Sequence, residues 1–109
     1  MKYYDTQTRS ITLVTGVKGE ELETKTYSFP FFVEGIYTKK SIDLGAELEE
    51  KQFTIDADLF ERITTFVVGL YGNQFTSDDL VKGIDTRHIV DAYIAVLFGT
   101  LQGDTSKKE

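Results

Sequence analysis

The strongest pattern in this chain of 109 residues is the stretch ADLFERITTFVVGLY at 57–71. Its apolar residues recur at the spacing of one helix face, and they are Leu59, Phe60, Ile63, Phe66, Val67, Leu70 and Tyr71. The pattern predicts an amphipathic helix whose apolar face belongs to the core. Asp56 or Asp58 is placed to cap its start, and Asp58 with Glu61 has capping-box spacing. Gly72 is suited to end the helix in the left-handed conformation.

A shorter helix is expected directly after this one. Thr76 and Asp79 again have capping-box spacing, and they predict a two-turn helix over 76–82 that Gly83 stops. The two aspartates at its start favour the positive end of the helix dipole. Capping therefore explains these carboxylates without any catalytic chemistry.

The last helix is expected over about 86–98, with Asp85 as its cap and with Gly99 and Gly103 marking its end. This segment is apolar around much of its girth, which indicates a central or intersubunit position. The polar segment after it, 102–109, is expected to be disordered.

Upstream of these helices, two segments rich in threonine and β-branched residues, 9–15 and 22–29, flank a glycine-containing turn at 16–20. They predict a β-hairpin. A lone hairpin is marginally stable in water, so it has to pack against something. Two arrangements remain open: it packs only on its own helices, or it also pairs with another copy through an exposed edge. A weaker helix pattern follows at 41–51, with Ser41 placed as its cap.

The segment FPFFV, residues 29–33, lies between the hairpin and the helices. Pro30 lacks a backbone donor and favours extended backbone at the residue before it, so this segment is not expected to be helical. Each phenylalanine carries about 150–250 Å² of surface that is costly to leave in water. Two interpretations remain open: the segment is a connection that packs into the core, or it is an apolar surface that binds a partner protein.

These elements predict an α+β fold. We expect a single domain over 1–101, with the β-hairpin at about 9–29 and a body of about four α-helices at about 40–101. No apolar stretch approaches the ~20 residues of a membrane span, and no signal peptide is recognisable. The protein is therefore expected to stay in the compartment where it is made.

The composition excludes several classes of function. The chain has no cysteine, which rules out disulfides, cysteine-bound zinc and thiol catalysis. Its net charge of −6 argues against a general binder of nucleic acids or anionic membranes. The charge is uneven, because residues 1–40 carry six basic and five acidic side chains, whereas 41–109 carry six and thirteen. The N-terminal 40 residues are thus nearly neutral, and the rest of the chain is acidic.

No constellation of residues indicates catalysis or metal binding. His88, the single histidine, stands three residues before Asp91, but a metal site needs more converging ligands. No motif places a nucleophile beside His88, and the glycines within 69–72 lack the spacing of phosphate-binding loops. We expect no enzyme activity, no cofactor and no metal, and infer that the chain acts by binding proteins.

A resemblance to a known family is carried by the stretch FVVGLYGNQFTSDDLVKGI at 66–84. It resembles the tail assembly chaperones of long-tailed bacteriophages, most of all those of phages that infect Gram-positive bacteria. That family has an apolar helix, an aromatic-Gly-Asn-Gln-Phe-Thr turn, a Leu and a Gly, and a final apolar helix. Here the turn maps to 71–76, and the resemblance covers about 40–101. Tyr71 stands where phenylalanine is often found.

The resemblance implies a small, mostly helical protein that is absent from the mature virion and works in the cytoplasm of the infected host. Such chaperones bind the tape measure protein, keep it soluble, and recruit the major tail tube protein for polymerisation around it. Many are made in two forms, the longer by programmed ribosomal frameshifting. Partners, or another copy in a homo-oligomer, are predicted to contact seven apolar side chains: Phe29, Phe31, Phe32, Tyr71, Phe75, Tyr93 and Leu97.

Two alternative functions remain open. The first is a structural tail component of the terminator or connector type, which a hairpin would suit. The second is an acidic inhibitor that mimics DNA, for which the net charge is the only support.

Overall fold

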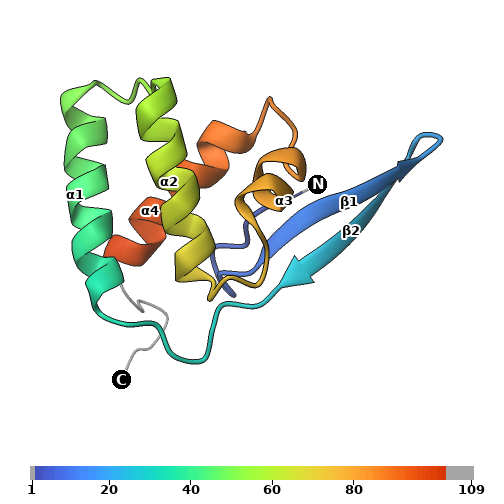
Figure 1. Ribbon diagram of the computed structural model, residues 1–109, viewed down its shortest axis with the longest axis horizontal. Coiled ribbons are helices and arrows are strands. Elements are labelled where there is room, and N and C mark those ends of the chain that lie inside the picture. Colours follow the sequence, from blue (N-terminus) through green and yellow to red (C-terminus); the bar gives the residue numbers. More distant parts are fainter. Residues whose placement is uncertain (1, 103–109) are drawn as a thin grey trace.

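The computed structural model describes residues 2–102 of the chain. The elements in chain order are β1 (Ile11–Lys18), β2 (Glu21–Tyr27), α1 (Ile36–Glu50), α2 (Ala57–Leu70), α3 (Ser77–Lys82) and α4 (Ile89–Gln102). The predicted α+β fold, an N-terminal antiparallel hairpin followed by four helices, is confirmed (Figure 1). The predicted disordered segment at 102–109 lies outside the described residues, except for Gln102, which ends α4.

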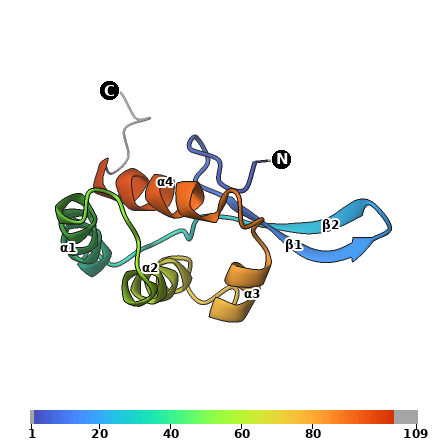
Figure 2. The ribbon, with the colours of Figure 1, turned by 90° about the horizontal axis from the view of Figure 1, so that it is seen from above.

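The helical body is built from α1 and α2, which lie side by side, and α4, which crosses behind them (Figures 1 and 2). Each of these helices contacts the other two, and α3 packs against α2 and β1. Fully buried side chains from all four helices fill the space between them, among them Leu48, Leu59, Ile63, Val67, Leu70, Leu80 and Leu97. Burial of each such side chain contributes roughly 1.5–3 kcal/mol, so helix packing dominates the stability of the body.

The long periodic helix begins at the predicted Ala57 and ends at Leu70, one residue before the predicted end, with Tyr71 as its C-cap. Of the two candidate caps, Asp56 is the one used, and its carboxylate accepts a hydrogen bond from the Leu59 N–H at 2.8 Å. The capping box expected at Asp58 and Glu61 does not form, because Asp58 already lies inside the helix. Gly72 follows the helix at a φ of +70°, the left-handed conformation expected there.

The start of α3 also agrees with the prediction. The Thr76 hydroxyl accepts a hydrogen bond from the Asp79 N–H at 3.0 Å, and the Asp79 carboxylate accepts one from the Thr76 N–H at 3.1 Å. This is the reciprocal capping box that the spacing indicates. Gly83 lies directly after the helix and caps its C-terminus.

The predicted start of the first helix at Ser41 is wrong. The helix begins at Ile36, and its N-cap is Gly35, which has no side chain to mark the start. Ser41 is instead buried within the helix, where its hydroxyl donates a hydrogen bond to the Thr38 carbonyl at 2.8 Å.

Both predicted limits of the last helix are also wrong. The helix begins at Ile89, because Asp85 caps a separate turn in which its carboxylate accepts a hydrogen bond from the Arg87 N–H at 2.8 Å. It then continues through Gly99. A Cβ at Gly99 would lie 2.7 Å from the Tyr4 hydroxyl, so this glycine permits close packing and does not end the helix.

The hairpin turn is shorter than the predicted 16–20. The strands are joined at Gly19 and Glu20, and the φ of +63° at Gly19 suits the first central position of a type II′ turn. Gly16 belongs to β1, where the register shifts between Val14 and Gly16. This irregularity absorbs one extra residue in β1.

Only one end of the hairpin is anchored to the helices. Ile11 and Leu13 are buried in the core, and the Val14 N–H donates a hydrogen bond to the Gly83 carbonyl at 2.9 Å. By contrast, β2 is exposed from residue 21 to residue 26. The far end of the hairpin therefore projects away from the helical body (Figures 1 and 2).

Substitution of Gly83 by alanine tests this anchor. A Cβ there would lie 2.7 Å from the Asp79 carbonyl oxygen and 2.9 Å from Leu13 Cβ. We expect Gly83→Ala to lower the free energy of unfolding by about 1–3 kcal/mol in urea denaturation. Gly45→Ala is the contrast, because its Cβ would lie in ordinary contact with Leu101 and alanine favours a helix interior; it should raise stability by up to ~1 kcal/mol. Equal effects of the two substitutions would contradict this description.

Candidate functional site

The turn between α2 and α3 forms the centre of an aromatic cluster. Tyr71 and Phe75 are both buried, and the Tyr71 ring meets Phe29 edge to face, with centroids 5.5 Å apart. Phe75 in turn packs edge to face against Tyr27 at 5.0 Å. The Tyr71 hydroxyl donates a hydrogen bond to the Arg9 carbonyl, and burial raises the pKa of this hydroxyl. The turn thus ties the helices to one end of the hairpin, where β1 begins and β2 ends.

Four of the seven predicted contact residues lie in the core. Tyr71, Phe75, Tyr93 and Leu97 expose at most 3% of their surface, and the Tyr93 hydroxyl shares a hydrogen bond of 2.6 Å with the Thr64 hydroxyl. In this conformation none of the four offers its side chain to a partner. Their predicted role in protein binding stays a prediction, and their observed contacts are those of residues that hold the fold together.

The other three predicted residues belong to an exposed aromatic segment, defined as residues 29–32. Phe31 is fully exposed and Phe32 is 75% exposed, whereas Phe29 is half-buried against Tyr71. The Arg9 guanidinium lies 5.6 Å from the centre of the Phe29 ring, a cation–π distance. One end of the aromatic segment is therefore fixed, and the other faces solvent.

The aromatic segment borders an open cleft with a volume of about 650 Å³. The other wall of the cleft is the N-terminal loop, and the lining residues are Thr6, Gln7, Thr8, Arg9, Phe29, Pro30 and Phe31. Beyond Phe32, Ile36 at the start of α1 adds a further apolar side chain that is 48% exposed. Sequence reasoning did not single out the loop at 6–9, because it carries no periodicity and no motif.

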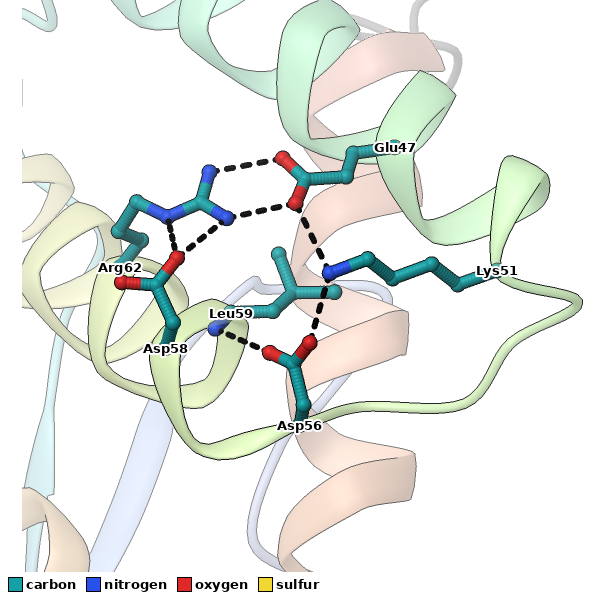
Figure 3. A network of polar contacts seen from close by, with 6 residues as sticks. All are labelled: Glu47, Lys51, Asp56, Asp58, Leu59 and Arg62. Atoms are coloured by element: carbon teal, nitrogen blue, oxygen red, sulfur yellow. Dashed lines mark hydrogen bonds and ion pairs between the residues drawn. The ribbon is translucent and has the colours of Figure 1, made fainter.

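The strongest polar cluster joins the end of α1 to the start of α2 (Figure 3). Arg62 donates hydrogen bonds to both Glu47 carboxylate oxygens, at 2.7 and 2.6 Å, and also pairs with Asp58. Lys51 lies 3.1 Å from Glu47 and 2.8 Å from Asp56. These hydrogen bonds lower the pKa of Glu47 to about 2. Each of the three carboxylates contacts at least one of the two cations, so the cluster is a structural clamp between two helices.

The described residues contain no cluster of three or more histidine and carboxylate side chains positioned to hold a metal ion. Within 2–102, every buried side-chain nitrogen or oxygen has a hydrogen-bond partner, so no buried polar side-chain atom there needs a ligand to satisfy it. No helix among those described has both the length and the apolar character needed to cross a membrane. The surface features that call for an explanation are therefore apolar.

A family model described as phage tail chaperone protein matches residues 7–109. The chain belongs to the phage tail chaperone family. The match confirms the resemblance carried by 66–84 and extends it over the hairpin and the aromatic segment, where the sequence motif was silent. No match was found among curated proteins or among solved structures. A phage tail chaperone acts in tail assembly and belongs to no enzyme family.

For this phage tail chaperone, Tyr71→Phe tests the hydroxyl that distinguishes the turn. The substitution keeps the ring and removes the donor to the Arg9 carbonyl. We expect it to lower the free energy of unfolding by roughly 0.5–1.5 kcal/mol in urea denaturation. Tyr37→Phe is the control, since the Tyr37 hydroxyl makes no hydrogen bond within residues 2–102, and it should be near neutral. A neutral Tyr71→Phe would show that the Tyr71 ring, and not its hydroxyl, makes the contribution of this residue to stability.

The ion-pair clamp predicts a pH dependence of stability. The folded state lowers the pKa of Glu47 from 4.5 to about 2, so its stabilisation is present above pH 4.5 and is lost as the pH falls towards 2. Urea midpoints measured across this window should fall less steeply for Glu47→Gln than for the unsubstituted chain. Glu49→Gln changes the same charge on the same helix outside the clamp, and it should leave the slope unchanged. Identical slopes for all three proteins would contradict the clamp.

Proposed function

We propose that this phage tail chaperone binds the tape measure protein through its exposed aromatic segment. In this proposal it keeps the tape measure protein soluble in the host cytoplasm, promotes polymerisation of the major tail tube protein around it, and is absent from the mature virion. The observation that carries the proposal is the exposure of Phe31 and Phe32, which are adjacent in the chain and both face solvent.

Exposure of two neighbouring phenylalanines is unfavourable for an isolated chain. Burial of one such side chain is worth roughly 1.5–3 kcal/mol, and within residues 2–102 nineteen other aromatic and aliphatic side chains are buried in the core. A partner that covers Phe31 and Phe32 recovers this free energy. Adjacent exposed aromatic residues are typical of the anchor residues of protein interfaces.

The aromatic segment is also pre-organised for binding. Pro30 restricts the backbone before Phe31, and Phe29 is held by the Tyr71 ring and the Arg9 guanidinium. A segment fixed in this way loses little conformational entropy when it meets a partner. The adjoining cleft provides a concave surface beside Phe31 that can receive an apolar side chain of that partner.

A tape measure protein suits this surface chemically. It is long and helical, and its apolar stripes aggregate when they are uncovered. A helper for such a client needs an apolar contact surface together with enough net charge to keep the complex in solution. The exposed phenylalanines supply the first, and the net charge of −6 supplies the second.

No observation favours the two alternative functions over this one. A DNA mimic needs rows of carboxylates without neutralising cations, whereas Glu47, Asp56 and Asp58 alternate with Lys51 and Arg62. A structural tail component would be present in purified virions in stoichiometric amounts, and mass spectrometry of intact particles separates it from a transient helper.

Co-expression with the tape measure protein tests the proposal. The double substitution Phe31→Asp, Phe32→Asp places two charges on the surface that should bind the client. We expect the tape measure protein to become insoluble and to stop co-purifying with the variant. Because both side chains face solvent, the free energy of unfolding should change by about 0.5 kcal/mol or less.

A charge-matched control separates this effect from net charge alone. Ile42→Asp, Val81→Asp adds the same two charges at exposed apolar positions on α1 and α3. This control should still solubilise the client. If the Phe31→Asp, Phe32→Asp protein remains folded by circular dichroism and still co-purifies with the tape measure protein, the aromatic segment is not the client surface.

A further inference from the structure

The two outer edges of the hairpin differ in how far they are covered. The edge of β1 is covered by the N-terminal segment, since the Thr12 N–H donates to the Tyr3 carbonyl at 2.9 Å and Tyr4 bridges to Ile11. Further along, the Val14 N–H is bonded to the loop after α3. The outer edge of β2 has no strand beside it within residues 2–102. Its backbone donors and acceptors are therefore free to pair with another strand.

The sequence of this free edge is self-complementary. The strand reads ELETKTY from Glu21 to Tyr27, with Glu23 and Lys25 on either side of Thr24. Two copies placed antiparallel about Thr24 set Glu23 of each copy opposite Lys25 of the other. Opposite charges that face each other directly across two strands stabilise the pairing.

We propose that β2 pairs with β2 of a second copy, antiparallel and centred on Thr24, to form a four-stranded sheet across a two-fold axis. The pairs across the axis are Thr24 with Thr24, Glu23 with Lys25, Leu22 with Thr26, and Glu21 with Tyr27. A two-fold interface requires the same surface on both copies, and this strand satisfies that condition by its own charge order.

The neighbouring registers are disfavoured by the same charges. Residues that lie opposite each other on two antiparallel strands point to the same face of the sheet. The two-fold axis of a symmetric pairing must therefore pass through a residue and not between two residues. Centring on residue 23 sets Glu23 against Glu23, and centring on residue 25 sets Lys25 against Lys25. Like charges directly opposite each other are destabilising. Among these three registers, only the one centred on Thr24 pairs opposite charges.

The position of the hairpin leaves room for a second copy. Residues 21–26 are all exposed, and this half of the hairpin projects away from the helices (Figure 1). Val17 and Leu22, which pair across the hairpin, are 66% and 50% exposed. In the four-stranded sheet, Leu22 packs against the Thr26 methyl group of the other copy. The interface shares no residue with the aromatic segment, so it can be tested independently of client binding.

Charge reversal on the full chain tests the register by analytical ultracentrifugation across micromolar to millimolar concentrations. By symmetry, Lys25→Glu alone or Glu23→Lys alone replaces two attractive pairs by two repulsive ones. Each should weaken dimerisation about tenfold or more. The double variant Glu23→Lys, Lys25→Glu restores opposite charges across the axis and should restore the dimer.

Lys18→Glu is the matched control on the other strand. Lys18 lies 3.9 Å from Glu23 within the same hairpin, and both side chains are exposed. Reversal of this charge removes an ion pair within the hairpin but leaves both charges that pair across the axis, Glu23 and Lys25, in place, so the dimer should persist. Loss of the dimer in Lys18→Glu to the same degree as in Lys25→Glu would overturn the proposed interface.

Single cysteines provide a second readout, because the natural chain has none. Two Thr24→Cys side chains would face each other across the axis at a separation that a disulfide spans, and oxidation should cross-link them. Two Thr26→Cys side chains would lie about 13 Å apart along the strands, and they should remain uncross-linked. A chain that is monomeric at all concentrations, or equal cross-linking of both variants, would overturn the proposal. If the β2 amides are protected from hydrogen exchange only when a tail protein is added, the β2 edge binds that protein and not a second copy, which would also overturn the proposal.

Discussion

The buried ring of Tyr71 connects two parts of the chain that are far apart in sequence. It follows the last turn of α2, packs against Phe29 and Phe75, and bonds through its hydroxyl to the Arg9 carbonyl. A two-stranded hairpin has too little core of its own to be stable in water, and this cluster supplies the missing apolar contact. The hairpin and the helical body therefore form one packed unit at this turn.

The same anchor decides what stays exposed. With Phe29 fixed against the cluster and Pro30 next to it, Phe31 and Phe32 are directed into solvent, and Phe31 lies beside the N-terminal loop. The far half of the hairpin extends beyond the reach of the helices. A small chaperone thus presents two separate surfaces, one aromatic and one with a free strand edge, on a body held together by apolar packing. Neither surface requires a reactive group, which agrees with membership of a tail chaperone family.

The elements that were predictable from sequence are those that carry their own local signals. Helical periodicity defined α2, and a reciprocal capping box defined α3. The start of α1 was missed because Gly35 offers no capping side chain, and the end of α4 was misplaced because Gly99 makes room for Tyr4, a tertiary contact. The candidate site was predictable only in part. Composition identified surplus aromatic residues. Which of them are exposed depends on packing between distant segments of the chain, and this packing leaves Phe31 and Phe32 in solvent.

The central claim is that the aromatic segment, held in place by the buried turn, is where the client is bound. Hydrogen–deuterium exchange of the co-expressed complex with the tape measure protein, compared with the free chain, tests it most directly. We predict slower exchange in the complex for residues 29–36 and in the N-terminal loop at 6–9. Unchanged exchange in these two segments, with new protection confined to other parts of the chain, would contradict the account.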